Sequence, residues 1–291
     1  VMIQAAPSLI PAKTAAGEVD LQIRYLSFGD YTFLRAPEAR QRYHTDLWRA
    51  GTGAHFALYP NLNVNDAVMR KLYRDVRFRR ALSLGIDRNL INQSLFFGLA
   101  DAGNNTVLPQ SPLFREEFAT RWATHDPAEA NRLLDEIGLT KRNGDGIRLL
   151  PDGRPLQIVV ETAGEDTEQT DILTLIRDDW QAIGVKLFTK PSQRQLFRNR
   201  VFAGITGMSV WSGWDNGIPT ADMTPAELAP TMQGELEWPK WGQYFETAGV
   251  AGEPPDLPEA KALLQLYRDW RATTDEAERR RIWLQMLQIH A

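Results

Sequence analysis

The chain has 291 residues, of which 43% are hydrophobic and 24% are charged, and its net charge is −4. This composition predicts a packed core, and acids and bases are interspersed, so nucleic acid is not expected as a partner. Without cysteine, the chain has no disulfide framework, thiolate metal site or thiol nucleophile, and no apolar run approaches the ~20 residues of a membrane span.

The first half of the chain predicts two extended segments and two helices. Apolar and polar residues alternate over residues 19–25, which predicts a half-buried strand. Residues 55–63 (HFALYPNLN) predict a second extended segment. Residues 75–98, DVRFRRALSLGIDRNLINQSLFFG, predict one helix followed by a sharp turn. The segment 126–138 begins with Asp-Pro and ends with Gly, which predicts a capped helix.

The middle of the chain predicts a hairpin and a strand–helix–strand unit. Turn signals at residues 143–146 (NGDG) and 151–153 (PDG) predict a β-hairpin that continues into residues 156–162. An apolar stripe predicts a helix over residues 167–183, and residues 185–189 predict the next strand. We expect the two strands to share one sheet.

The last part of the chain continues the alternation of helices and strands. A short helix is predicted over residues 193–200, a strand over 201–208, and two closing helices over 257–270 and 275–290. Residues 211–241, rich in Gly and Pro, are expected to form loop. The alternation as a whole predicts an α/β fold.

The order of three segments resembles a known family. These segments are AGEVDLQ (residues 16–22), the start of the predicted helix (residues 75–88), and a stretch of small residues and proline (residues 99–112). Their order is similar to that in the bacterial extracellular solute-binding proteins of family 5, the oligopeptide and dipeptide receptors of ABC importers. The matching helix residues are Asp75, Arg77, Arg79, Ala81, Leu82, Ile86, Asp87 and Arg88. Gly85 stands where the family usually has alanine.

The resemblance implies a periplasmic-binding-protein-like (type II, Venus-flytrap) α/β fold, with a mixed sheet flanked by helices. Residues 1–60 would then end the first lobe, and residues 61–291 would form the second, ligand-binding lobe, with a hinge near residues 59–65. The abrupt ends of the chain predict a fragment that lacks the N-terminal half and the extreme C-terminus.

The resemblance also implies a non-enzymatic receptor. It would capture peptides or other amine-bearing solutes in the periplasm, or outside the cell as a tethered lipoprotein. The receptor would deliver its ligand to the transmembrane subunits of an ABC permease, through which alone it would meet the membrane. No cofactor is expected. A metal site is not expected either, because the histidines form no HxxxH or HExxH pair. These histidines are His44, His55, His125 and His290.

The candidate ligand site is the segment that follows the predicted strand 201–208. In peptide-binding members of the family, a Gly-Trp-x-x-Asp segment supplies an aspartate that pairs with the free α-amino group of the peptide. Asp215 is the nearest match, although it follows Trp214 without a spacer, and Asp222 is the alternative. An amine that leaves water needs such a carboxylate partner. Asp215, Asn216 and the following glycine also fit a simple turn.

Two further interpretations concern the aromatic and acidic residues near this segment. Trp211 and Trp214 are candidates for a wall of the ligand site, and the alternative is that the tryptophans of this region form the core of a long loop. Asp215, Glu235 and Glu237 also allow an alternative function, a secreted carbohydrate-active hydrolase with paired acids and tryptophan stacking. Asp87 and Arg88, in contrast, are expected to be structural.

Overall fold

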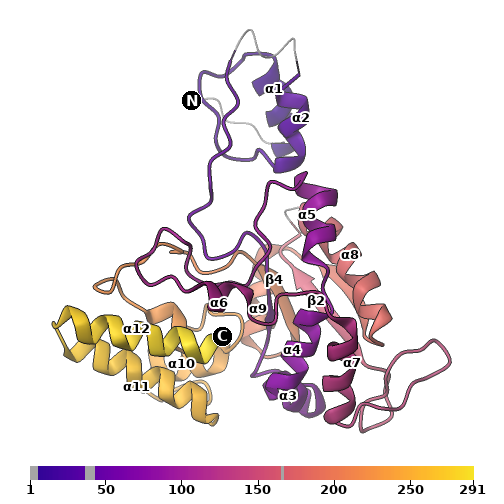
Figure 1. Ribbon diagram of the computed structural model, residues 1–291, viewed down its shortest axis with the longest axis vertical. Coiled ribbons are helices and arrows are strands. Elements are labelled where there is room, and N and C mark those ends of the chain that lie inside the picture. Colours follow the sequence, from indigo (N-terminus) through magenta and orange to yellow (C-terminus); the bar gives the residue numbers. More distant parts are fainter. Residues whose placement is uncertain (1–5, 37–42, 165–166) are drawn as a thin grey trace. The chain divides into compact units, whose positions relative to one another are not determined.

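The computed structural model describes residues 6–36, 43–164 and 167–291 (Figure 1). The chain divides into two compact units. The first unit comprises residues 1–49 and 92–100, and the second comprises residues 50–91 and 101–291. The sequence placed a boundary at residue 60; how the two units correspond to the lobes of a receptor stays a prediction.

The first unit consists of short helical segments. Its elements are η1 (Pro7–Leu9), α1 (Ile10–Ala15), η2 (Phe28–Asp30), α2 (Tyr31–Leu34) and the last residues of α5 (Arg88–Phe96). An aromatic cluster surrounds Phe28, whose ring centroid lies 5.6 Å from Tyr31, 5.6 Å from Phe96 and 5.7 Å from Phe97. These ring pairs connect η2 with α2 and with the C-terminal end of α5.

The strand predicted over residues 19–25 is wrong. These residues form no strand, and the side chains of Leu21 and Ile23 are 76% and 57% exposed. A strand needs a neighbour that takes up its backbone hydrogen bonds. No described residue forms a strand next to this segment, so the alternating apolar side chains have no sheet face on which to be buried.

A mixed four-stranded sheet lies at the centre of the second unit. Its strands are β1 (Ala57–Pro60), β2 (Gln157–Thr162), β3 (Lys186–Pro191) and β4 (Met208–Trp211), in the order β1-β4-β2-β3. Strand β2 runs parallel to β3 and β4, whereas β1 is antiparallel to β4. The sheet confirms the predicted α/β class with a mixed sheet flanked by helices.

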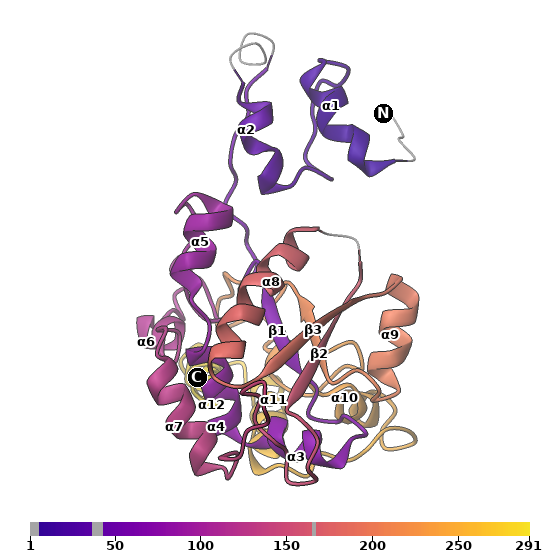
Figure 2. The same cartoon turned by 90° about the vertical axis from the view of Figure 1, so that its right-hand side faces the viewer.

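The predicted strand–helix–strand unit is confirmed. Helix α8 (Thr167–Ala182) connects β2 to its parallel neighbour β3, and Figure 2 shows α8 and α9 (Arg194–Phe202) on either side of these strands. The apolar stripe of α8 is buried, and Trp180 at its end donates a hydrogen bond of 3.0 Å from Nε1 to the carbonyl of Leu82. Periodicity of apolar residues therefore identified the buried face correctly.

The single helix predicted over residues 75–98 is in fact two helices. They are α4 (Val76–Leu84) and α5 (Arg88–Phe96). The chain turns at Gly85, where a Cβ would lie 2.7 Å from Cδ1 of Ile183. Asp87 then caps α5, accepting a hydrogen bond of 2.9 Å from the backbone of Leu90. Arg88 donates to the carbonyl of Ser83 at 2.9 Å, so the pair Asp87 and Arg88 is structural, as expected.

The predicted strand at residues 201–208 is also wrong. Helix α9 extends to Phe202, because Val201 and Phe197, one turn apart, pack together with Ala163. The chain leaves the helix at Gly204, whose φ is +70°, and the strand β4 begins only at Met208. Trp211 is therefore the last residue of a strand and not part of the loop beyond it.

The remaining helices all belong to the second unit. They are α3 (Ala67–Arg74), α6 (Glu116–Thr120), α7 (Pro127–Glu136), η3 (Ala226–Leu228), α10 (Pro239–Glu246), α11 (Pro258–Ala272) and α12 (Glu276–His290). The predicted helices α7, α11 and α12 are confirmed, and Asp126 caps α7 through the backbone of Glu129 at 2.9 Å. Helix α10 corrects the prediction of loop throughout 211–241. None of the helices in the described part of the chain has the length and apolar composition to cross a bilayer.

The predicted hairpin is present in reduced form. Antiparallel bridges join Arg142 to Arg148 and Leu149 to Pro155, but regular strand begins only at Gln157. Turns this tight leave too few residues between them for a longer ladder.

Leu82 tests the packing of α4 against the rest of the second unit. Its side chain is buried, whereas Leu90 on α5 is exposed. Leu82→Ala should lower the free energy of unfolding by about 2–5 kcal/mol, because apolar burial is lost and a cavity remains. Leu90→Ala is the matched control and should cost under about 1 kcal/mol. Denaturant melts measure both changes, and equal losses would contradict the packing described.

Candidate functional site

The candidate segment 212–217 is held by backbone hydrogen bonds that continue the β1–β4 pair beyond the sheet. Gly213 donates to the carbonyl of Ala54 at 2.7 Å, Gly53 donates to that of Trp214 at 2.8 Å, and Gly217 donates to that of Gly51 at 2.7 Å. These bonds satisfy peptide groups that would otherwise be buried without partners. The segment is therefore ordered by residues 51–54, which are remote in the sequence, and not by local turn chemistry alone.

Glycine and one asparagine make this close approach possible. A Cβ on Gly213 would lie 2.2 Å from the backbone nitrogen of Ala54 and 2.2 Å from Oδ1 of Asn105. The same Oδ1 accepts a hydrogen bond of 3.0 Å from the backbone of Trp214. No side chain fits at Gly213, so the residue type is dictated by the contact.

The three polar candidates lie at the surface of this loop. Asp215 is exposed, and its backbone nitrogen donates to Oε1 of Glu227 at 3.1 Å. Asn216 accepts a hydrogen bond of 3.0 Å from the backbone of Ile218, as the turn interpretation expects. Asp222 is hydrogen-bonded by the hydroxyl of Thr220, which lowers the pKa of Asp222. Only Asp215 among the three has no side-chain hydrogen bond within the described residues.

The tryptophans of this region are mainly core residues. Trp214, Trp238 and Trp241 are buried, and Trp214 meets the ring of His290 edge-on at 5.4 Å. Trp211 alone is partly exposed; its ring stacks on Phe197 at 6.4 Å. A single partly exposed ring is what this region offers to a ligand.

Sequence reasoning missed an acidic cluster beside the loop, formed by Asp215, Glu227 and Glu237. Burial raises the pKa of Tyr59, and the charges of Glu237, Glu227 and Asp215 raise it further. The three carboxyl groups are thus close enough to the Tyr59 phenol for their charges to raise its pKa. Tyr59 itself donates a hydrogen bond of 2.7 Å to the carbonyl of Ser212.

The glutamates of the acidic cluster are disfavoured as anions. Burial, followed by the charge of Glu227, raises the pKa of Glu237 to about 7. Burial raises the pKa of Glu227, and the charge of Asp215 adds to this. Among the described residues, no cation is a cause of either shift. A carboxylate in such surroundings gains from a cationic partner or from a proton.

The carboxylate of Glu235 is engaged in hydrogen bonds within the chain and is not free to act with Glu237 as a pair of catalytic acids. It accepts a hydrogen bond from Nε1 of Trp238 and another of 3.3 Å from the backbone of Thr231. Burial, then the charge of Glu237, raises the pKa of Glu235 well above its usual range. Its role is to hold the chain before α10, and this removes the main support for the hydrolase interpretation. In the described part of the chain, no group of three His, Asp or Glu residues is placed to hold a metal ion.

No local pattern could have revealed the acidic cluster. Tyr59 lies in β1, Glu227 lies in η3, and Glu237 precedes α10. Only the tertiary fold brings these positions together. Asn105, which fixes the loop, is likewise remote in sequence.

Comparison with known proteins identifies the class. In solved structures, the chain matches the oligopeptide-binding protein OppA with a TM-score of 0.77, 30% identity and coverage of 99% of this chain and 48% of OppA. It matches the periplasmic binding protein MelB of Agrobacterium fabrum, in complex with stachyose, with a TM-score of 0.72, 15% identity and coverage of 98% and 43%. The periplasmic-binding-protein fold is thereby confirmed, and the chain spans about half the length of these structures.

The chain belongs to the bacterial extracellular solute-binding proteins, family 5, whose middle region matches residues 12–233. This confirms the resemblance found in the sequence. A family of binding proteins also agrees with the expectation of a receptor, not an enzyme.

Three curated relatives have different descriptions. Identity is 26% over 129 residues with a probable ABC transporter-binding protein of Deinococcus radiodurans, covering 44% of this chain and 21% of that protein. It is 23% over 228 residues with the periplasmic alpha-galactoside-binding protein of Rhizobium meliloti, covering 76% and 31%. It is 28% over 165 residues with the dipeptide-binding protein of Escherichia coli, covering 55% and 29%.

Glu237 gives the acidic cluster a measurable pH dependence. Its folded-state pKa is raised, so its stabilising contribution is fully present below about pH 4.5 and is lost as the pH rises through about 7. Glutamine at this position cannot ionise, so the free energy of unfolding of Glu237→Gln should not show this loss. As the pH rises from about 4.5 to about 7, the variant should become more stable relative to the unchanged chain by about 1–3 kcal/mol. Denaturant melts at acidic and alkaline pH measure the difference.

The matched control for this experiment is Glu259→Gln, at an exposed position of α11. A pH dependence of equal size in both variants would show that burial of Glu237 is not its origin.

Proposed function

We propose that this chain provides ligand-binding structure for the receptor of an ABC importer. The receptor captures peptides or other amine-bearing solutes in the periplasm, or outside the cell as a tethered lipoprotein, and delivers them to the transmembrane subunits of the permease. Family membership supports the receptor role. The descriptions of the Deinococcus and Escherichia coli relatives support, respectively, the transporter partner and the peptide ligand.

The acidic cluster is the observation that carries the choice of a cationic ligand. The pKa of Tyr59 is raised by burial and by the charges of Glu237, Glu227 and Asp215. Among the described residues, no cation contributes to this pKa shift. A ligand ammonium group would provide the missing positive charge. Its hydrogen bond to a carboxylate is charge-assisted and strong when both groups leave water.

The site residues have distinct proposed roles. Asp215 accepts from the ligand amine, because its carboxylate is exposed and lacks a side-chain partner among the described residues. Trp211 offers the partly exposed part of its ring, against which Phe197 and the guanidinium of Arg194, 5.2 Å from the ring centroid, already lie. Trp214 supports the loop from the buried side. Asn216 and Asp222 lie at the rim of the same loop, and both are engaged in local hydrogen bonds. The lobe that binds the ligand comprises most of residues 61–291 together with residues 50–60, which supply β1 and the segment that holds the loop, and the preceding residues end the other lobe.

A neutral oligosaccharide is the second candidate ligand. The relative that aligns over 76% of this chain is an alpha-galactoside-binding protein. A protonated Glu237 could donate a hydrogen bond to a sugar hydroxyl, since its pKa of about 7 leaves it partly neutral. Charge separates the two candidates, because a neutral oligosaccharide can accept and donate hydrogen bonds at these carboxyl groups but brings no positive charge to compensate them.

The amine-binding role of Asp215 is tested by calorimetry on the whole receptor. A dipeptide with a free amine should bind, whereas its N-acetylated form should bind at least about 30-fold more weakly. Asp215→Asn should weaken binding of the free dipeptide by a similar factor, because it keeps an acceptor but removes the charge.

Asp178→Asn is the control, since Asp178 lies at an exposed position of α8 and its carboxylate pairs only with the neighbouring Arg177 among the described residues. Equal binding of the free and acetylated dipeptides would show that the amine is not recognised. Binding of stachyose with no dependence on Asp215 would favour the second candidate.

A further inference from the structure

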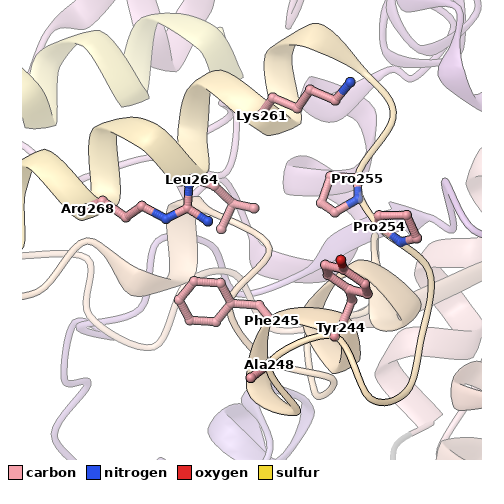
Figure 3. A pocket seen from close by; sticks show the side chains of 9 residues that line it. Tyr244, Phe245, Ala248, Pro254, Pro255, Lys261, Leu264 and Arg268 are labelled. Carbon is pink, nitrogen blue, oxygen red and sulfur yellow. The ribbon is translucent and has the colours of Figure 1, made fainter.

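A cavity of about 490 Å³ lies between α10 and α11, apart from the acidic cluster (Figure 3). Its volume is in the range of sites that hold small organic ligands. Tyr244, Phe245 and Leu264 provide apolar and aromatic walls, and Pro254 and Pro255 close the opposite side. Figure 3 shows Arg268 and Leu264 on one side of the space, and the Tyr244 ring beside the two prolines on the other.

The walls of the cavity are fixed before any ligand arrives. Glu253, next to the prolines, forms ion pairs with Lys240 at 2.8 Å and with Arg70 at 3.5 Å. Its backbone nitrogen donates to the carbonyl of Lys240 at 3.0 Å. At Gly252, a Cβ would lie 2.3 Å from that carbonyl oxygen, so the loop is packed against α10. A pre-formed pocket binds without the entropy cost of ordering its own walls.

The two aromatic rings that line the cavity, Phe245 and Tyr244, are also held by neighbouring residues. Phe245 meets the ring of Tyr267 edge-on, with centroids 6.0 Å apart. Tyr244 lies against the backbone of Gly249, where a Cβ would be 3.3 Å from the phenol ring. The flat faces of the cavity therefore suit a flat apolar group.

The charge of the cavity is positive. Lys261 and Arg268 line it from one helix, seven residues or about 10 Å apart along α11. Within the described residues, neither side chain has an ion-pair partner. Other basic side chains nearby do form ion pairs, as Arg74 does with Asp256 at 2.9 Å. No carboxylate is among the lining residues.

We propose that this cavity is a second ligand site, for a small organic anion with a flat apolar body, such as an aromatic carboxylate. The aromatic and proline walls take the body, and the guanidinium of Arg268 takes the carboxylate in a charge-assisted hydrogen bond. Lys261 adds to the positive potential at the rim. The site has the opposite charge preference to the acidic cluster, so its ligand differs from the amine-bearing solute, and the inference does not depend on the proposed function.

Binding of 2-naphthoate to the 291-residue chain tests the proposal, followed by NMR of the labelled protein. Saturable binding is expected with a dissociation constant of about 0.1–1 mM, and with shifts in residues that line the cavity. The uncharged 2-naphthalenemethanol should bind at least about fivefold more weakly, and 2-naphthylmethylamine should not bind there.

Arg268→Gln should weaken 2-naphthoate binding at least about fivefold and leave the melting temperature unchanged, because the side chain is exposed and unpaired within the described chain. Arg198→Gln is the matched control, an exposed arginine on α9. The proposal is overturned if 2-naphthoate shows no saturable binding, if the amine binds as well as the carboxylate, or if both variants behave alike.

Discussion

The candidate site depends on one physical constraint, the close backbone contact between residues 51–54 and 213–217. Hydrogen bonds from Gly213 and Gly217 extend the β1–β4 pair beyond the end of the sheet. Because Gly213 has no Cβ, the two segments can approach closely enough for these hydrogen bonds, and the approach leaves no room for a side chain there. The loop that carries Asp215 is therefore part of the framework. Groups held in place before binding add affinity, because the ligand does not have to order them.

That constraint has an electrostatic consequence. The ordered loop brings Asp215 next to Glu227, and the chain before α10 brings Glu237 to the same neighbourhood of Tyr59. Burial and a neighbouring carboxylate raise the pKa of Glu227 and of Glu237, so these two groups are costly to keep ionised in the absence of a ligand. A cationic solute would relieve this cost, and binding energy and charge selectivity would then have the same origin. A neutral solute would instead favour the protonated form of Glu237.

Much of the fold could be predicted from the sequence because its signals are local. The stripe of α8 and the Asp-Pro start of α7 act within one or two turns, so periodicity and capping identified them. The reason for glycine at the break between α4 and α5 could not be seen, because a side chain there would meet Ile183, which is remote in sequence. The site follows the same division. Asp215 is a candidate through a family motif and stays a prediction, whereas Glu227 lies beside it only through tertiary structure.

The central claim is that this site selects a positively charged solute. Native mass spectrometry of the whole receptor, purified without denaturation, tests it most directly, because a ligand retained from the cell can be released and identified. The acidic cluster predicts a peptide or another solute with a free amine, bound one to one. A neutral oligosaccharide in that position would contradict the claim and would assign the carboxyl groups to hydrogen bonding with sugar hydroxyls.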